Sequence, residues 1–128
     1  MEDLLSPIIW RIFTRPDGTS AMEQVPLPMG AAGATGGASK HLGGNGVMFR
    51  YMPADMSADW HPAPRRQMVA TISGEGEIET GDGQVLVLRP GVVTLLEDLQ
   101  GKGHLTRGRG ATGRLSVFIP LDDSTAIP

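Results

Sequence analysis

Two histidines with acidic residues near them are the side chains of this 128-residue sequence best suited to chemistry. His61 stands two residues after Asp59. His104 stands six residues after Asp98, and Gly101 and Gly103 lie between them. Imidazole titrates nearest to neutral pH, and a neighbouring carboxylate fixes which ring nitrogen carries the proton. Histidine and aspartate are also common metal ligands. The pattern predicts either proton transfer, with Asp59 or Asp98 orienting a histidine, or a metal site.

Strand alternation would place Asp59 and His61 on one face and Trp60 on the other. If that face turned inward, an imidazole and a carboxylate would enter the core together. The alternative for Asp59 is an ordinary turn or strand-edge residue. Glu97 and Asp98 have the same alternative, because adjacent acids are common in turns.

Short apolar runs recur along the chain and are separated by glycine and proline. Almost none has the spacing of an amphipathic helix, and each has the length of a strand. This pattern is typical of an all-β sandwich or barrel. The predicted strands cover residues 8–13, 47–52, 67–72, 77–80, 84–88, 92–96 and 114–121.

The clearest local unit is a hairpin turning at Asp82 and Gly83, residue types that tolerate a positive φ. Before it, Glu75, Glu77 and Glu79 recur at every second position and so share one face. We expect this face to be solvated, with the residues between the glutamates turned inward. The alternative is an acidic metal row.

Residues 26–46 are rich in glycine and alanine and have no periodic apolar pattern. A segment of this length inside a compact domain is usually disordered or functional. We expect a long mobile loop, with a lid over the mouth of a barrel as its function. His41 lies in this segment and is expected to be solvated rather than a ligand.

Residues 47–121 resemble a small single-domain cupin. The resemblance rests on the stretches DWHPAPRR (59–66), ISGEGEI (72–78), RPGVVTLLED (89–98) and GKGH (101–104). It implies an all-β, cupin-type jelly-roll barrel, also called a double-stranded β-helix. By the same resemblance the barrel mouth holds a small ligand, often with a divalent metal, and the protein is a homodimer.

Both cupin motifs are degraded here. In the first, Asp59 and His61 take the places of the two histidines, and Gln67 stands where the metal-binding glutamate is expected, one residue late. In the second, Gly101 and His104 keep their register. The resemblance therefore implies a metal set of His61, His104, Asp59 and Gln67. Two histidines and a carboxylate are the ligand types of a facial-triad iron site. Iron, manganese, zinc and nickel are candidates, and the alternative is a cavity without metal.

Arg65 and Arg66 enter a predicted strand after a Pro-Ala-Pro spacer. One of them should face the barrel or its rim, where a guanidinium matches a substrate carboxylate. The alternative is a surface ion pair with the hairpin glutamates. Gln67 and Asp98 complete the predicted substrate-binding set.

Length and composition favour a single domain over residues 1–128 with a sizeable core. The absence of cysteine excludes thiol nucleophiles, disulfides and iron–sulfur clusters. A formal charge of −3 argues against general nucleic-acid binding, although basic residues between 101 and 114 suit one local anion. The sequence shows no membrane span and no secretory signal, so a cytoplasmic protein is expected.

The function predicted from the sequence is small-molecule binding in the barrel. We expect an enzyme that acts on a small polar or carboxylated metabolite by metal-assisted or histidine acid/base chemistry, as an oxygenase, isomerase or lyase. One alternative is a non-catalytic binding or sensing module without metal. Another is an interaction protein whose barrel is a filled core.

Overall fold

A computed structural model describes residues 8–30, 34 and 36–127 of the chain. All regular elements in these residues are β-strands, as the short apolar runs predict. No helix that could cross a membrane occurs among them. The strands are β1 (Ile8–Thr14), β2 (Ser20–Pro26), β3 (Met48–Met52), β4 (Ser57–His61), β5 (Gln67–Ser73), β6 (Glu75–Glu79), β7 (Val85–Leu88), β8 (Val93–Glu97), β9 (His104–Arg109) and β10 (Arg114–Pro120).

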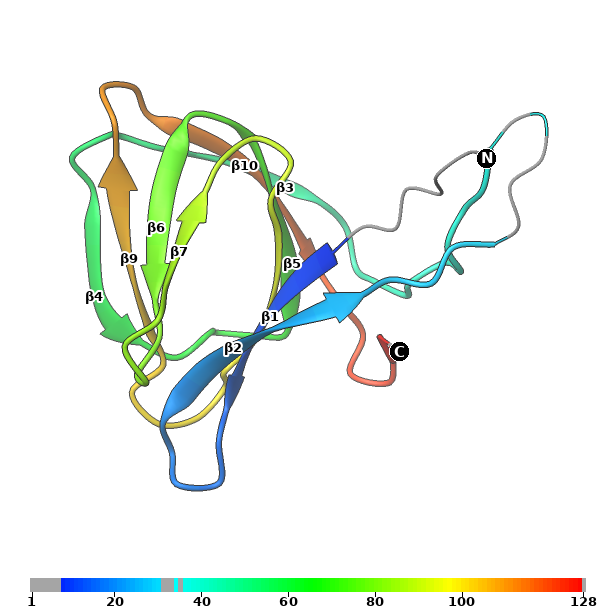
Figure 1. The fold of residues 1–128 in the computed structure, drawn as a ribbon, viewed down its shortest axis with the longest axis horizontal. Helices are drawn as coiled ribbons and strands as arrows, with labels where there is room; N and C mark the ends of the chain where they lie inside the picture. Colours follow the sequence, from blue (N-terminus) through cyan, green and yellow to red (C-terminus); the bar gives the residue numbers. More distant parts are fainter. Residues whose placement is uncertain (1–7, 31–33, 35, 128) are drawn as a thin grey trace.

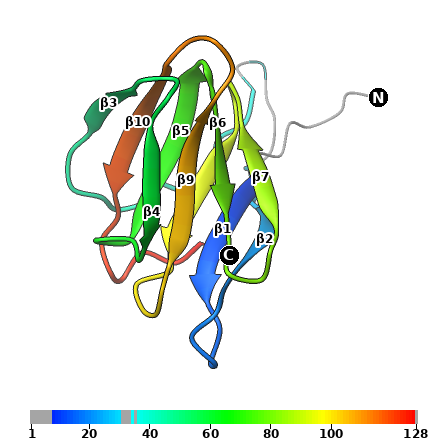
Figure 2. The same cartoon turned by 90° about the vertical axis from the view of Figure 1, so that its left-hand side faces the viewer.

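The strands form two sheets that face each other across the core (Figures 1 and 2). The six-stranded sheet has the order β2-β1-β8-β5-β10-β3, and the four-stranded sheet has the order β4-β9-β6-β7. If β3 to β10 are lettered B to I, these orders contain B-I-D-G and C-H-E-F, the two sheets of a jelly roll. The predicted all-β jelly roll is therefore confirmed. Strands β1 and β2 extend one sheet, with β1 parallel to β8.

The predicted hairpin joins β6 to β7, which pair antiparallel. Gly83 adopts a φ of 90°, a conformation that favours glycine. On the outer face of β6 the three glutamates form ion pairs with arginines of the neighbouring β9, while Ile78 is buried. The glutamate row thus belongs to a partly solvated outer surface, as predicted.

Three strands, β2, β4 and β9, lie outside the seven predicted ranges, and only the alternation expected for Asp59 to His61 pointed to β4. β9 was hidden because its inward residues, His104 and Thr106, are polar, so the strand contains no apolar run. β2 begins with buried Ser20 and ends at a proline, which makes it equally hard to recognise. A strand whose inward side chains are polar does not carry the signal of one that packs apolar side chains against a core.

The segment between β2 and β3 includes the predicted loop, of which residues 31–33 and 35 lie outside the described residues. Its other residues run on the side of the six-stranded sheet away from β4 and β9 (Figure 1). Leu27 and Leu42 pack there against buried Ile9, Leu95 and Leu121. In its described part this segment does not form the expected lid, because none of those residues lines the cavity between the sheets.

Candidate functional site

A cavity of about 230 Å³ lies between the two sheets. It is smaller than the roughly 300–1,000 Å³ of pockets for drug-sized ligands and therefore suits a small metabolite. The interior is thus not a completely filled core. The side chains of its wall include apolar Met52, Met56, Val69, Ile78, Leu88, Leu96 and Phe118, and polar Arg50, His61, Gln67, His104, Thr106 and Arg114.

A β-bulge in β4 decides which of its side chains enter the cavity. Ala58 pairs with Thr106 and His61 pairs with His104, so three steps on β4 face two steps on β9. The extra residue breaks the alternation, and both Ala58 and His61 line the cavity. Asp59 is exposed, and its Oδ1 accepts a hydrogen bond of 2.8 Å from the next backbone N–H. Asp59 does not line the cavity, so the expectation that it enters the barrel together with His61 is wrong.

A glycine lets the two imidazoles come together. Gly103 has a φ of 74°, and a Cβ at this position would lie 2.0 Å from the carbonyl oxygen of His61. Any other residue would push the end of β4 away from β9. With glycine, the ring centroids of His61 and His104 are 4.9 Å apart and the ring planes are inclined by 52°. The structure therefore brings the two predicted histidines to one place in the cavity wall.

His104 is held by a buried carboxylate. Its Nδ1 lies 2.6 Å from Oδ2 of Asp98, which is fully buried behind the imidazole. A carboxylate oxygen accepts the hydrogen bond, so Nδ1 carries the proton and Nε2 is left as an acceptor. The backbone carbonyl of Asp98 also accepts the N–H of Ala63, which fixes the turn. Of the two aspartates predicted to orient a histidine, Asp98 makes this contact.

His61 is the exposed member of the pair. Its Nδ1 lies 2.7 Å from the backbone carbonyl oxygen of Asp59, which can only accept, so Nδ1 donates here as well. The ring is thereby oriented by its own strand. Both histidines have Nδ1 engaged, and Nε2 is the nitrogen of each that remains for a ligand or substrate.

The predicted metal set does not assemble. Across residues 8–30, 34 and 36–127, no group of three or more histidine, aspartate or glutamate side chains is placed to hold a metal ion. The cavity wall offers His61, His104 and the buried Gln67, without the carboxylate that a two-histidine, one-carboxylate site needs. The residues therefore do not fit the predicted facial triad. Whether the protein binds a metal in another way stays a prediction to be tested.

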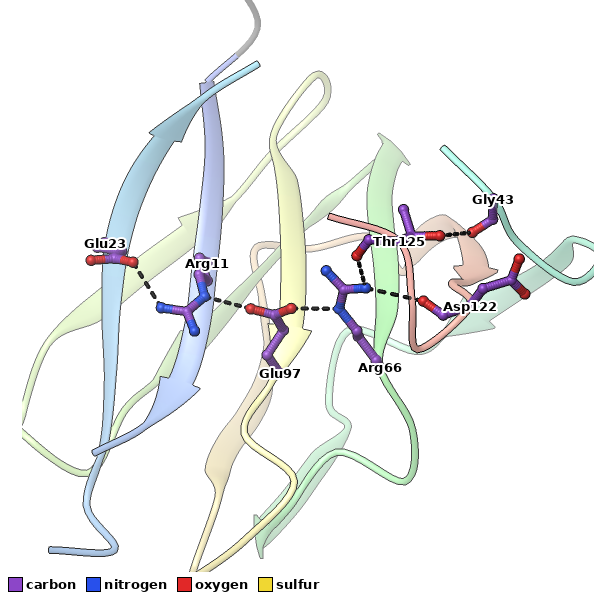
Figure 3. Close-up of polar contacts among 7 residues, drawn as sticks. All are labelled: Arg11, Glu23, Gly43, Arg66, Glu97, Asp122 and Thr125. Atoms are coloured by element: carbon purple, nitrogen blue, oxygen red, sulfur yellow. Dashed lines mark hydrogen bonds and ion pairs between the residues drawn. The ribbon is translucent and has the colours of Figure 1, made fainter. Parts of the chain in front are cut away.

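Neither predicted arginine lines the cavity. Arg65 is exposed, and Arg66 lies on the outer face because its neighbour Gln67 points inward. Figure 3 shows Arg66 bound to Glu97 of β8 and to backbone carbonyls near the C-terminus, those of Asp122 and Thr125. Arg66 therefore ties the C-terminal segment to the sheet.

Glu97 is the centre of this outer network, because Arg11 of β1 binds its other carboxylate oxygen and also pairs with Glu23 of β2 (Figure 3). Burial alone would raise the pKa of Glu97, but the hydrogen bonds from Arg11 and Arg66 outweigh it and hold that pKa below its ordinary value. Glu97 of β8 is thus linked to β1 through Arg11 and to the residue before β5 through Arg66, and it does not line the cavity.

Two other arginines line the cavity, and sequence reasoning missed both. Arg50 of β3 is exposed, whereas Arg114 of β10 is 4% exposed. The available signal was alternation, since Arg114, Ser116 and Phe118 occupy one face of a strand. In the sequence, Arg114 belongs to the basic residues between 101 and 114 that suit one local anion, and no inward position was predicted for it.

No family model matches the sequence, and no curated protein matches it. Among solved structures, protein NMB1881 from Neisseria meningitidis is 14% identical with a TM-score of 0.47, and the match covers 95% of this chain and 89% of that one. A candidate ethanolamine utilization protein Q, EutQ, from Salmonella typhimurium LT2 is 12% identical with a TM-score of 0.44, over 94% of this chain and all of that one. At these identities and TM-scores, neither structure indicates an activity for this chain.

Proposed function

We propose that the protein is a cupin-type enzyme that binds a small metabolite between its sheets and moves a proton with His104 and His61. The jelly-roll strand order and the motif-like residues around both histidines support the cupin assignment. The observation that carries the activity is His104 in the cavity wall, with the buried Asp98 at its Nδ1. Proton transfer without a metal favours an isomerase or lyase over an oxygenase.

His104 is the general base in this proposal. Asp98 keeps the proton on Nδ1 and stabilises the imidazolium that forms when Nε2 accepts a proton from substrate. The apolar side chains around the cavity exclude water and strengthen this interaction. A suitable substrate carries a C–H bond next to a carbonyl group, since such a proton is acidic enough for an imidazole to remove.

His61 is the partner acid. Its ring lies beside that of His104 and reaches solvent, so it can exchange protons with water between turnovers. In this proposal the neutral imidazole of His104 removes a proton from one substrate atom. The protonated imidazole of His61 delivers a proton to a different substrate atom. Such a pair serves an isomerisation, or an elimination in which the acid protonates the leaving group.

Deuterium exchange tests the proposal without knowledge of the product. The protein is incubated in deuterium oxide with a panel of small 2-oxo and 3-oxo acids, and proton NMR follows each C–H signal. We expect wild-type protein to exchange one position of at least one compound. His104→Ala should lower that rate about 10²-fold or more, since general-base contributions are typically 10²–10⁴-fold.

His41→Ala is the matched control, because His41 is exposed in the loop and does not line the cavity. It should exchange like wild type. If compounds bind but none exchanges or turns over, the protein is the non-catalytic binding module and the proposed activity is wrong. Equal exchange rates for His104→Ala and wild type would also reject it.

The homodimer and the cytoplasmic location remain predictions from the sequence. A small-molecule ligand is the partner that the cavity suits, because its volume and its largely apolar wall match a small metabolite.

A further inference from the structure

The cavity wall carries two full positive charges and no negative one. Arg50 and Arg114 line it, and among the described residues no aspartate or glutamate does. Asp98 contacts His104 of the cavity wall but does not itself line the cavity. The charge of Arg114 therefore has no protein counter-ion inside, which is unusual because buried charges in proteins are nearly always paired.

The guanidinium of Arg114 has little to bind in the protein. Its Nη2 donates to the sulfur of Met52 at 3.3 Å, a weak acceptor, and its Nη1 has no hydrogen-bond partner. Burial, and after it the charge of Arg50, lower the pKa of Arg114 from its ordinary value. The protein thus holds a strong donor in place without satisfying it.

The missing side chain of Gly76 leaves room for the guanidinium of Arg114. A Cβ at Gly76 of the opposite sheet would lie 3.0 Å from Nε of Arg114 and 3.2 Å from the carbonyl oxygen of Arg107. Glycine at this position lets the guanidinium reach across the gap between the sheets. Because the side chain is confined there, little conformational entropy is lost when it binds an anion.

Two further buried donors lie on the same face of the sheet, although neither lines the cavity. The hydroxyls of Ser116 and Thr71 have no hydrogen-bond partner, and these residues pair with each other across β10 and β5. Buried polar groups without partners usually mark a place where water or a ligand binds. Water can satisfy the hydroxyls, but it does not balance the charge of the guanidinium.

We propose that Arg114 binds the carboxylate of a small organic acid whose apolar body lies against Met52 and Phe118. A carboxylate matches the planar guanidinium fork and carries the single charge that is missing. The exposed Arg50 adds positive potential that draws the anion in. This proposal names the substrate class for the site described above. Carboxylate binding by Arg114 does not depend on the proposed proton transfer, and only the identity of the group that reacts at His104 rests on it.

In this proposal Arg114 contacts the carboxylate end of the ligand, and the imidazoles contact its other end. Nε of Arg114 and the carbonyl oxygen of Arg107 both lie beside Gly76, 3.0 and 3.2 Å from the position of a Cβ there. Arg107 is three residues along β9 from His104, which is about 10 Å at the rise of a strand. A small acid anchored at Arg114 can therefore extend toward the imidazoles. Held in this way, its distal atoms are those presented to His104.

Isothermal titration calorimetry with acid and amide pairs tests the proposal. Pentanoate and benzoate are compared with pentanamide and benzamide, with inorganic phosphate as a further probe, on wild type, Arg114→Met and Arg109→Met. We expect at least one carboxylate to bind wild type at least tenfold more tightly than its amide and than phosphate. Arg114→Met should lose this preference, and Arg109→Met, altered on the outer surface, should keep it.

Folding of Arg114→Met is checked by circular dichroism and by its melting temperature, which should equal or exceed that of wild type because an unpaired buried charge is removed. Gly76→Ala is the second variant, since its methyl group displaces the guanidinium while Arg114 is kept. Equal binding of acid and amide, tighter binding of phosphate, an undiminished preference in Arg114→Met, or no carboxylate binding by wild type at millimolar concentration would each overturn the proposal. His104→Ala separates the two ideas: it should lose deuterium exchange and retain carboxylate binding.

Discussion

Nδ1 of His104 lies 2.6 Å from a carboxylate oxygen of Asp98, and both side chains are buried beside a cavity that no aspartate or glutamate lines among the described residues. This contact links the residue after β8 to the first residue of β9, and it fixes the orientation of the His104 ring. Oδ1 of Asp98 has no hydrogen-bond partner, so the carboxylate depends on the imidazole. This arrangement is compatible with the proton transfer proposed above, and the next variant tests it.

Asp98→Asn should reduce proton transfer while ligand binding persists. An amide presents a donor or a neutral acceptor to Nδ1, so the tautomer is no longer fixed and the imidazolium loses its stabilising charge. We expect exchange to fall about 10²-fold or more with an unchanged dissociation constant for the bound acid. Deuterium exchange and calorimetry on the same preparation measure the two quantities. A parallel loss of binding and exchange would instead indicate that Asp98 only supports the fold.

Glu97→Gln should destabilise the protein at neutral pH. The carboxylate bridges Arg11 and Arg66. One charged hydrogen bond contributes about 1.5–3 kcal/mol, and the amide oxygen of glutamine can still accept from one of the two arginines, so a loss of about 1–3 kcal/mol in the free energy of unfolding is expected. Urea denaturation measures it. Glu23→Gln, which removes the more exposed partner of Arg11, is the control and should change stability by about 0.5 kcal/mol or less.

The pH dependence of that loss has a definite sign. The folded pKa of Glu97 lies below its ordinary value of 4.5, so the stabilisation is complete above the ordinary value. It disappears as the pH falls through the lower, folded pKa. The difference between wild type and Glu97→Gln should therefore shrink on acidification below 4.5. A difference that stays constant down to strongly acidic pH would contradict the ion-pair explanation.

The predicted homodimer has a plausible surface on β3. This strand is an edge of the six-stranded sheet, and Phe49 and Tyr51 are 68% and 65% exposed on it. The backbone of an edge strand is free to pair with the same strand of a second copy, which would cover both aromatic rings. We expect Phe49→Lys to give a monomer in sedimentation experiments. Val85→Lys, on the edge of the other sheet, should remain dimeric, and a monomeric wild type would refute the prediction.

Elemental analysis of protein purified without an affinity tag tests the metal prediction. The cavity presents two imidazoles and one amide, so we expect less than one equivalent of tightly bound iron, manganese, zinc or nickel. One full equivalent that is lost in both His61→Ala and His104→Ala would show that these residues hold a metal after all. In that event the mechanism without metal would have to be abandoned.

Much of the fold followed from sequence pattern, because apolar runs and glycine turns depend on short-range geometry. β6 and β7 are the best example, since Gly83 and the alternation of Ile78 with glutamates fix both the turn and the face. β9 was not recognised because the side chains that it turns toward the cavity, those of His104 and Thr106, are polar. Its inward positions resemble those of a surface strand until the opposite sheet is known.

The site was only partly predictable for similar reasons. His61 and His104 emerged from residue type, and their proximity depends on a glycine that removes a steric barrier between two strands. Asp59 was misplaced because a bulge of one residue changes the face of every side chain beyond it. Arg114 was missed because nothing local distinguishes an inward arginine from a surface one.

The unpaired Arg114 also has a consequence for the evolution of this protein. An unpaired guanidinium in the interior destabilises the empty protein, and exchange for methionine or leucine relieves that burden in a single step. A descendant that no longer used the cavity would be free to make this exchange and would gain stability from it. If distant descendants kept arginine at this position, natural selection would still be acting on ligand binding. This would hold even where other residues had replaced both histidines.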